Sequence, residues 1–507
     1  MGDECAPLHT LRELLDWKST VKYRGEPLKD KIADGGTPKT LLCHDMMGGY
    51  LEDRFVNGSK SCNSYRFYHW DKIDVFVYFS HHLVTIPPVG WINAAHRHNV
   101  KVLGTFITEW DAGSEVLERI KRDNLTADVA TRLADIAHAY GFDGWLMNIE
   151  STMADGCGAF MEDFLSAIAS ATHRKVEGSM VLWYDSFIHN GELKWQNELN
   201  DYNKSFFNLC DGIFLNYGWT AENLEKSAEV AGKRKADVYV GIDVFARNTE
   251  YPGGFETCKS VEQVRKLGLS AAIFAPGWVY ETQEKDKFTE NQCRFWNFPK
   301  ELCRSQFSSL PIVTSFCQGF GRKMFEAGKI VSNEPWFNLS KQQLQPVCQS
   351  LNDETGKRQV DVCTEDAFYG GGSLRIHFSP RESSQFRLFS CNVSINDNLR
   401  VCYTLKPLDT AKEDNIFLVL VLKDKENCKR RLLLGSADGH DRQPREENVT
   451  VVLGNRKTEE IHNGWITRNY VLRKYSGFSL NKICLGCDSP ISRTCLLGQM
   501  MILPAKE

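Results

Sequence analysis

The amino-acid sequence predicts an α/β barrel followed by an all-β sandwich, and three observations lead to this prediction. Eight apolar segments of strand length recur between about residues 40 and 280, and helical patterns lie between most of them. From about residue 310 the helical patterns nearly vanish, and short β-rich segments replace them. Strands that are apolar on both faces and alternate with helices are typical of a parallel sheet that is covered on both sides.

Each of the eight apolar segments ends in polar or aromatic residues. Eight such units in about 240 residues match the number and size of a closed (β/α)8, or TIM, barrel, and an open doubly wound sheet is the alternative. The predicted strands are Thr40–Met47, Ile73–His81, Val100–Trp110, Phe142–Glu150, Met180–Ser186, Gly212–Trp219, Asp237–Arg247 and Ala271–Trp278. The helical patterns between them are Val116–Ala139, Phe160–His173, Trp195–Asn208, Ala221–Lys233 and Val261–Leu267.

The change of pattern predicts the domain organisation. We expect an N-terminal segment over residues 1–39 with one short amphipathic helix at Leu11–Trp17, the barrel over 40–305, and a jelly-roll-like accessory sandwich over 310–507. The β-rich segments of the sandwich are Ser373–Phe378, Phe386–Phe389, Arg400–Leu405, Ile416–Leu422, Val449–Leu453 and Trp465–Leu472. Such a domain either binds sugar or only supports the barrel.

Composition favours a soluble globular protein. The 507 residues are 42% hydrophobic and carry a net charge of −4, which does not favour nucleic acid or an anionic membrane as a partner. No apolar stretch has the length of a signal peptide or a membrane span, and 17 scattered cysteines fit reduced thiols, so we expect a cytoplasmic protein. No glycine-rich loop follows the first strand, so no dinucleotide is expected, and we expect no cofactor.

Residues at the C-terminal ends of barrel strands usually carry the chemistry. Here these ends are rich in carboxylates and aromatic residues rather than in histidines at metal-ligand spacing. His81 and His82 are adjacent and face opposite ways in extended chain, so we expect no metal. The candidate residues are His44, Asp45, His81, His82, Glu109, Trp110, Asn148, Glu150, Tyr184, Asp185, Asn216, Tyr217, Trp219, Asp243 and Trp278.

The fourth predicted strand carries the most informative pair. Asn148 and Glu150 stand two residues apart, so their side chains point the same way, about 6.6 Å apart along the strand. Glycoside hydrolysis ordinarily needs two carboxyl groups, but the neighbour of Glu150 is an amide. An amide can instead orient the 2-acetamido group of N-acetylglucosamine, whose carbonyl oxygen closes onto C1 to give an oxazolinium; substrate-assisted catalysis of this kind is a known exception.

Several blocks of the sequence resemble glycoside hydrolase family 85. The resemblance runs from about residue 40 to 300 and continues more weakly into the sandwich. The strand Phe142–Glu150 also resembles the Phe-Asp-Gly-x-Asp-x-Asp-x-Glu pattern of family 18 chitinases, but Leu146 and Asn148 replace two of its aspartates. The blocks that resemble family 85 are Leu41–Tyr50, Val75–His82, Ile86–Trp91, Gly104–Trp110, Phe142–Glu150, Leu182–Ser186, Leu193–Trp195 and Phe274–Trp278.

The resemblance to family 85 implies a retaining endoglycosidase that cleaves the β-1,4 bond in the di-N-acetylchitobiose core of N-glycans, with glycopeptides or free oligosaccharides as substrates and with transglycosylation as a side reaction. It implies that Glu150 is the acid and then the base, that Asn148 orients the acetamido group, and that Tyr184 is a further hydrogen-bond partner. Trp195 and Trp219 match family positions at the substrate groove.

Two alternatives stay open. In the first, the barrel uses two carboxylates, with Glu150 as the acid and Asp243 as the nucleophile. The second is a sugar-binding protein with an inactive barrel, although such proteins usually lack the acid. We expect His44, Glu109, Trp110, Trp195, Trp219, Asp243 and Trp278 to contact the substrate in the enzyme.

Overall fold

The computed structural model describes residues 3–30, 36–61, 65–154, 156–299, 302, 307–347, 360–409, 415–436, 448–454 and 459–505. Its contacts divide the chain into two compact units. The first comprises Met1–Asn57, Lys72–His96 and Val100–Cys303, and the second comprises Gly58–Asp71, Arg97–Asn99 and Arg304–Glu507. Two short stretches of the expected barrel range thus group with the second unit. The domain limits given above stay a prediction, because the expected barrel end at residue 305 lies outside the described residues.

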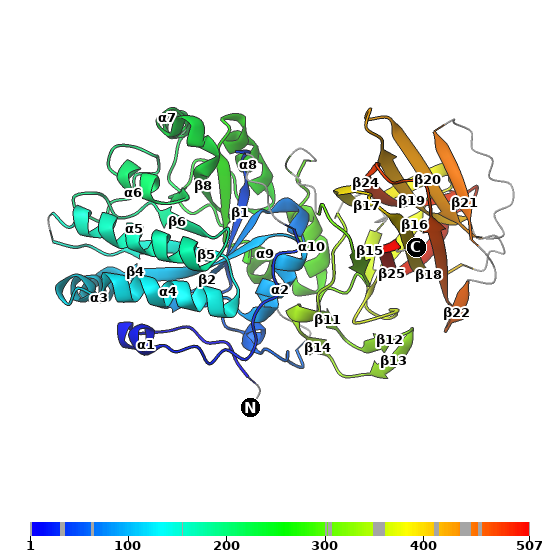
Figure 1. Cartoon of the computed structure of the whole chain (residues 1–507), viewed down its shortest axis with the longest axis horizontal. Helices are drawn as coiled ribbons and strands as arrows, with labels where there is room; N and C mark the ends of the chain where they lie inside the picture. The colour runs from blue at the N-terminus through cyan, green and yellow to red at the C-terminus, as the bar shows by residue number, and fades with distance from the viewer. Residues whose placement is uncertain are drawn as a thin grey trace. The chain divides into compact units, whose positions relative to one another are not determined.

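The first unit contains a closed ring of eight parallel strands, in the order β2-β1-β9-β8-β7-β6-β5-β4, with a β2–β4 pairing that closes the ring. Figure 1 shows the strands of this unit among its helices. The two-residue strand β3 (Val84–Thr85) pairs antiparallel with Thr105 and Phe106 of β4. The barrel prediction is confirmed and the open sheet is wrong. The strands are β1 Thr40–Asp45, β2 Val75–Phe79, β4 Lys101–Glu109, β5 Gly144–Glu150, β6 Met180–Tyr184, β7 Gly212–Leu215, β8 Val238–Asp243 and β9 Ser270–Phe274.

Helices follow most of the barrel strands. They are α2 Val89–Arg97, α3 Trp110–Arg122, α4 Thr126–Tyr140, α5 Gly158–Lys175, α6 Lys204–Leu209, α7 Ala221–Ala231, α8 Thr257–Lys266, α9 Trp278–Thr282 and α10 Phe288–Phe295, and α1 (Leu11–Asp16) precedes the barrel. The helix predicted over Val116–Ala139 is two helices, because Asn124 adopts a left-handed backbone with a φ of 53° between α3 and α4. The helix predicted over Trp195–Asn208 begins only at Lys204.

Alternation along the barrel strands fills the interior of the ring. Every second residue of a strand points inward, so short rows of apolar side chains from different strands meet there. Leu41 and Cys43 of β1 thus share one buried cluster with residues of the other strands. The other buried members are Val75, Val77, Phe79, Leu103, Ile107, Leu146, Met180, Leu182, Tyr184, Phe214, Tyr239 and Ala272.

The second unit is built from antiparallel sheets, apart from one parallel pairing between β20 and β21. A seven-stranded sheet has the order β15-β16-β25-β18-β23-β22, with β10 beside β25, and a five-stranded sheet has the order β17-β24-β19-β20-β21. Apolar residues from both sheets form one core, which defines the predicted sandwich. Its strands are β10 Ile312–Thr314, β15 Val360–Cys363, β16 Ser373–Phe378, β17 Arg381–Ser394, β18 Asn398–Pro407, β19 Ile416–Lys423, β20 Lys429–Gly435, β21 Val449–Leu453, β22 Glu460–His462, β23 Trp465–Leu472, β24 Ser479–Ser489 and β25 Arg493–Ala505.

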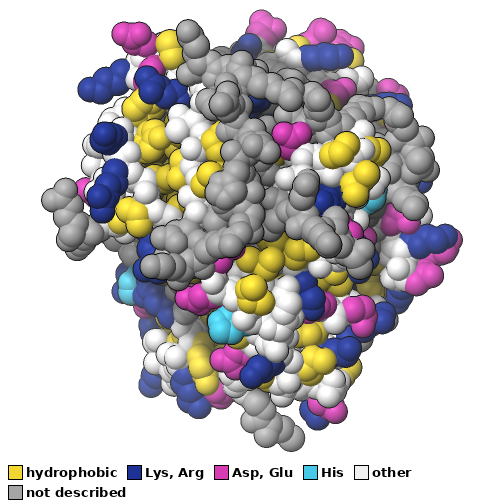
Figure 2. Space-filling model, turned by 90° about the vertical axis from the view of Figure 1, so that its right-hand side faces the viewer, with side chains coloured by type: hydrophobic (Ala, Val, Ile, Leu, Met, Phe, Trp, Pro, Cys, Tyr) yellow, Lys and Arg dark blue, Asp and Glu magenta, His cyan; other side chains and the backbone are white. Residues whose placement is uncertain are grey.

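Two small two-stranded sheets complete this unit, one of β11 (Phe320–Gly321) with β14 (Trp336–Phe337) and one of β12 (Met324–Glu326) with β13 (Lys329–Ser332). Acidic and basic side chains are interspersed on the face drawn in Figure 2. Among the helices of the described ranges, none is long and apolar enough to cross a membrane. The cysteines of the described part are free thiols, as the sequence predicts.

Gly144 begins the strand that carries Asn148 and Glu150, and its conformation suits glycine alone. Its φ is 139°, and a Cβ at this position would collide with the Met180 carbonyl of the neighbouring strand. We expect Gly144→Ala to lower the free energy of unfolding by about 2–3 kcal/mol, because strain and a backbone clash act together.

Gly178→Ala is the matched control. Gly178 also has a positive φ, of 68°, but a Cβ there would meet no atom within 4 Å. Denaturant unfolding should show a clearly smaller loss for this variant. Equal losses in the two variants would contradict the clash.

Candidate active site

Strand β5 presents Asn148 and Glu150 to the inside of the barrel. Leu146, on the same face, belongs to the interior cluster, whereas Trp145, on the opposite face, donates a hydrogen bond from Nε1 to the Leu133 carbonyl of α4 at 3.2 Å. Because side chains alternate along a strand, Asn148 and Glu150 lie on the inner face at the mouth of the ring.

Two N–H donors hold the carboxyl group of Glu150. Asn148 Nδ2 donates to Oε2 at 3.0 Å, and Trp195 Nε1 donates to Oε1 at 3.3 Å. Burial raises the pKa of Glu150, and the charge of nearby Glu109 adds to this effect, while the two hydrogen bonds act in the opposite direction. Because the net effect raises its pKa, the carboxyl group of Glu150 keeps its proton to higher pH than that of an exposed glutamate.

Glu109 stands beside Glu150 in the sheet, because the two residues are register partners of β4 and β5. Its Oε1 lies 2.9 Å from Nδ1 of His81, and this hydrogen bond is the largest cause of the raised pKa of His81. The ring of His82 instead packs edge-on against His9, with centroids 4.5 Å apart. The adjacent histidines therefore face different surroundings, and only His81 joins the carboxylates.

Tyr184 lies on the inner face of β6 and links to the next strand. Its hydroxyl donates to Asn216 Oδ1 at 2.8 Å. Burial raises the pKa of Tyr184 well above its usual range, and the negative charge of Glu150 is the next cause. The hydroxyl therefore stays protonated, as a neutral hydrogen-bonding group near Glu150.

Asp243 is placed differently from Glu150. Its carboxylate is buried and forms an ion pair with Arg247, at 2.9 Å between Oδ2 and Nε and 3.3 Å between Oδ1 and Nη2. It also accepts hydrogen bonds from the backbone N–H groups of Phe245 and Arg247. An arginine partner and backbone donors stabilise the charged form and occupy both oxygens.

The predicted aromatic residues divide into exposed and buried ones. Trp110 is 66% exposed with a left-handed φ of 51°, and Trp195 is 36% exposed. Trp219 is buried, donates from Nε1 to the Gly241 carbonyl at 2.6 Å, and stacks on Tyr251 with centroids 4.3 Å apart. Trp278 is half-buried, with its ring edge-on to Phe255 at 5.0 Å.

His44 does not lie with the other candidates. It is on the face of β1 opposite to Leu41 and Cys43, where its ring packs against Trp91 and Phe76 with centroids 5.1 and 5.5 Å away. Burial lowers its pKa to about 3, so it is neutral. The structure thus places His44 between the strand and α2, outside the ring interior.

Sequence reasoning missed two residues that organise the site. Asn197 accepts a hydrogen bond from Asn216 Nδ2 at 2.6 Å, and Arg247 neutralises Asp243. A signal for the first was present, because Asn197 begins a stretch rich in Asn and Asp, and such stretches are typical of loops rather than of the predicted helix.

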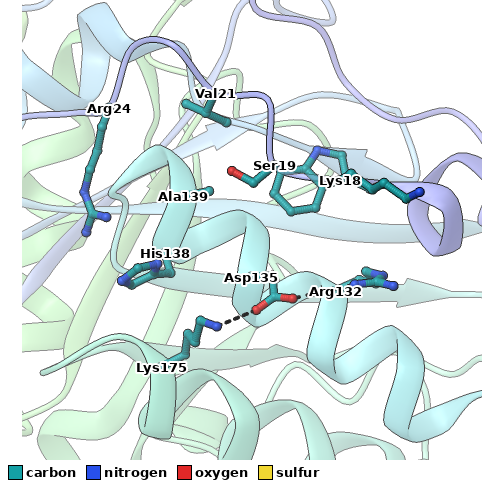
Figure 3. A pocket seen from close by; sticks show the side chains of 10 residues that line it. Lys18, Ser19, Val21, Arg24, Arg132, Asp135, His138, Ala139 and Lys175 are labelled. Carbon is teal, nitrogen blue, oxygen red and sulfur yellow. Dashed lines mark ion pairs between the residues drawn. The ribbon is translucent and has the colours of Figure 1, made fainter.

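One cavity of the first unit lies away from these residues. It has a volume of about 550 Å³ and lies between the segment before the barrel and helices α4 and α5 (Figure 3). In it, Asp135 pairs with Lys175 at 2.8 Å and with Arg132 at 3.7 Å. The predicted site residues do not line this cavity.

A glutamate with a raised pKa at the mouth of such a barrel, beside exposed tryptophans, is typical of a glycoside hydrolase. A protein-family model described as glycosyl hydrolase family 85 matches residues 50–324. The cytosolic endo-β-N-acetylglucosaminidase of Homo sapiens is 41% identical over 98% of this chain and 70% of its own length. That of Mus musculus is 41% identical over 99% of this chain and 71% of its own length.

The chain therefore belongs to glycosyl hydrolase family 85 and is a glycoside hydrolase. These relatives are named as cytosolic, in agreement with the location that the sequence predicts. The crystal structure of the glycoside hydrolase domain of Endo-D from Streptococcus pneumoniae is similar in fold, with a TM-score of 0.76 and 18% identity, over 100% of this chain and 84% of that one.

The contact between Glu109 and His81 gives a prediction for the mouth of the barrel. Glu109→Gln removes the negative acceptor, so burial becomes the main remaining effect on His81, and its pKa falls to or below the usual value of about 6.5. Titration of the imidazole resonances by NMR measures this change.

His138 is the internal control, because burial lowers its pKa and neither Glu109 nor His81 is among the causes. Its titration should change little in the variant. An unaltered pKa of His81 would show that the hydrogen bond does not form in solution.

Proposed function

We propose that this enzyme is a retaining endo-β-N-acetylglucosaminidase that hydrolyses the GlcNAc-β-1,4-GlcNAc bond in the chitobiose core of N-glycans. We further propose that the acetamido group of the substrate is the nucleophile. The observation that carries the proposal is the inward-facing pair of Glu150 and Asn148, in which the polar neighbour of the acid is an amide that can orient an acetamido group and cannot itself attack C1. The names of the relatives support this substrate class.

In the first step, Asn148 would accept a hydrogen bond from the acetamido N–H and so turn the carbonyl oxygen toward C1. That oxygen attacks C1 while Glu150 donates its proton to the glycosidic oxygen, and the C1–O bond breaks to give the oxazolinium and the departing N-acetylglucosamine, which now carries a free 4-hydroxyl and stays linked to asparagine in a glycopeptide. The Tyr184 hydroxyl, which is kept protonated by burial, can hydrogen-bond to the reacting acetamido group.

In the second step, the Glu150 carboxylate removes a proton from water, and the water oxygen attacks C1. The bond between C1 and the acetamido oxygen breaks, so the sugar recovers its acetamide with retained configuration. If a sugar hydroxyl takes the place of water, the same step transfers the glycan. Trp110 and Trp195 are exposed at the mouth and offer flat apolar faces for sugar rings.

The environments of the carboxylates favour this mechanism over the alternatives. A nucleophilic Asp243 would have to leave its ion pair with Arg247 and its backbone donors, which stabilise its charged form. An inactive sugar-binding barrel would not need Glu150 with a raised pKa. Detection of a covalent sugar adduct on Asp243 by mass spectrometry would instead support the two-carboxylate alternative.

Digestion of a high-mannose glycopeptide, followed by mass spectrometry, tests the proposed activity. The expected product is a peptide with one N-acetylglucosamine on its asparagine.

Glu150→Gln should lower the rate by about 10²–10⁴, the usual contribution of a positioned general acid. Because the protonated form is the acid, the wild-type rate should fall as the pH rises through the pKa of Glu150. Wild-type turnover in the variant would exclude Glu150 from the mechanism.

Asn148→Ala separates the two steps. Without the amide, the oxazolinium no longer forms efficiently from a glycopeptide, but a preformed sugar oxazoline enters after that step and needs only Glu150 as base. The variant should therefore fail to hydrolyse glycopeptides and still transfer sugar from an oxazoline donor to an N-acetylglucosamine acceptor. An equal loss of rate with the glycopeptide and with the oxazoline donor, in a well-folded protein, would contradict the substrate-assisted mechanism.

A further inference from the structure

The segment Lys194–Asn203 is the last part of the connection between β6 and α6 and forms no regular helix or strand, yet it carries Trp195, which donates to Glu150. An irregular segment needs other partners for its backbone N–H groups. Two of these groups find the same acceptor, because the N–H of Asn197 lies 2.8 Å from Asp185 Oδ2 and the N–H of Gln196 lies 3.2 Å from the same oxygen.

Asp185 directly follows strand β6 and is fully buried. Besides these two N–H groups, it accepts from Asn203 Nδ2 at 3.0 Å and from the backbone N–H of Asn216 at 3.5 Å. These donors are neutral, so within the described part of the chain hydrogen bonds stabilise the carboxylate and no ion pair does, and burial raises its pKa to about 6. A buried carboxylate without a cationic partner is costly, and a neutral residue would avoid that cost.

A second set of hydrogen bonds leads from the same segment to Tyr184. Asn197 Oδ1 accepts from Asn216 Nδ2 at 2.6 Å and from the N–H of Gly218 at 3.0 Å. Asn216 Oδ1 in turn accepts from the Tyr184 hydroxyl at 2.8 Å. The position of Asn197, which Asp185 holds through its backbone, thus affects the orientation of Tyr184.

We infer that Asp185 is a positioning residue that fixes Lys194–Asn203 and thereby aims Trp195 at Glu150 and Asn216 at Tyr184. It touches neither Glu150 nor Asn148 and does not take part in bond making. The inference rests on the proposed function for its effect on activity, but the ordering of the segment can be measured without any substrate. A misplacement of about 1 Å at a catalytic group can cost about 10²-fold in rate.

The test is Asp185→Asn, which keeps the size of the side chain but turns an NH2 group toward N–H donors. Hydrogen exchange should become faster in peptides that cover residues 194–203, and kcat/KM on the glycopeptide should fall by about 10–100-fold.

The matched control is Asp211→Asn. Asp211 Oδ2 accepts from the Val181 N–H at 2.6 Å and contacts His173 at 2.8 Å near the opposite end of β6. The Asp211→Asn variant should have a lower melting temperature than the wild type, while its kcat/KM stays within about 2-fold of the wild-type value.

A double-mutant cycle separates positioning from general destabilisation. Trp195→Phe removes the indole donor to Glu150. If Asp185 acts through the segment that carries Trp195, the double variant Asp185→Asn with Trp195→Phe should be little worse than Asp185→Asn alone. Multiplied losses, or normal exchange in residues 194–203 with kcat/KM within about 3-fold of wild type, would overturn the inference.

Asn197→Ala is the second variant if Asp185→Asn does not fold. It keeps the backbone N–H that donates to Asp185 but removes the acceptor for Asn216. We expect a smaller loss of kcat/KM and faster exchange near Asn216, and wild-type values for both would contradict the inference. If the wild-type protein fails to cleave glycopeptides, the proposed function fails, while the exchange data still decide whether Asp185 orders the segment.

Discussion

Strict alternation of side chains around a closed parallel ring is the constraint on which the site depends. Once Leu41 and Cys43 fill the inside of β1, His44 must point outward, and it packs against Trp91. The same alternation on β5 places Asn148 and Glu150 on the inner face, on the C-terminal side of Leu146. A shift of one residue in β5 would bury the candidate acid against α4 and bring Ile149 to the mouth.

The residues around the mouth differ mainly in the partners that surround them. Glu150 has two neutral donors and a carboxylate neighbour, and its pKa is raised. Asp243 has a guanidinium partner and backbone donors. Asp185 is fully buried, its donors among the described residues are all neutral, and its pKa is raised to about 6. The surroundings differ among chemically similar groups, and here they favour an acid at Glu150, an ion-paired carboxylate at Asp243 and a structural acceptor at Asp185.

The sequence predicted the barrel strands and the inward pair of β5 because both follow from local periodicity. It did not predict which strand-end residues meet, because that depends on partners far along the chain. Trp195 was expected on a helix, but its segment is irregular as far as Asn203, and the N–H groups of Gln196 and Asn197 bond to Asp185, a partner that no pattern within the segment indicates. Trp219 matched a groove position, but Tyr251 covers its ring, and no local pattern indicates that contact. Asn124 divides one predicted helix by a left-handed turn that propensity alone does not fix.

The proposed reaction requires the substrate to supply its own nucleophile at the mouth of this barrel. The most direct measurement is the cleavage rate of a series of chitobiose-core substrates in which fluorine atoms replace hydrogens of the acetamido methyl group beside the scissile bond. Fluorine withdraws electrons from the carbonyl oxygen, so we expect kcat to fall steeply and progressively with each fluorine. A kcat that does not vary along the series, with unchanged substrate binding, would contradict it.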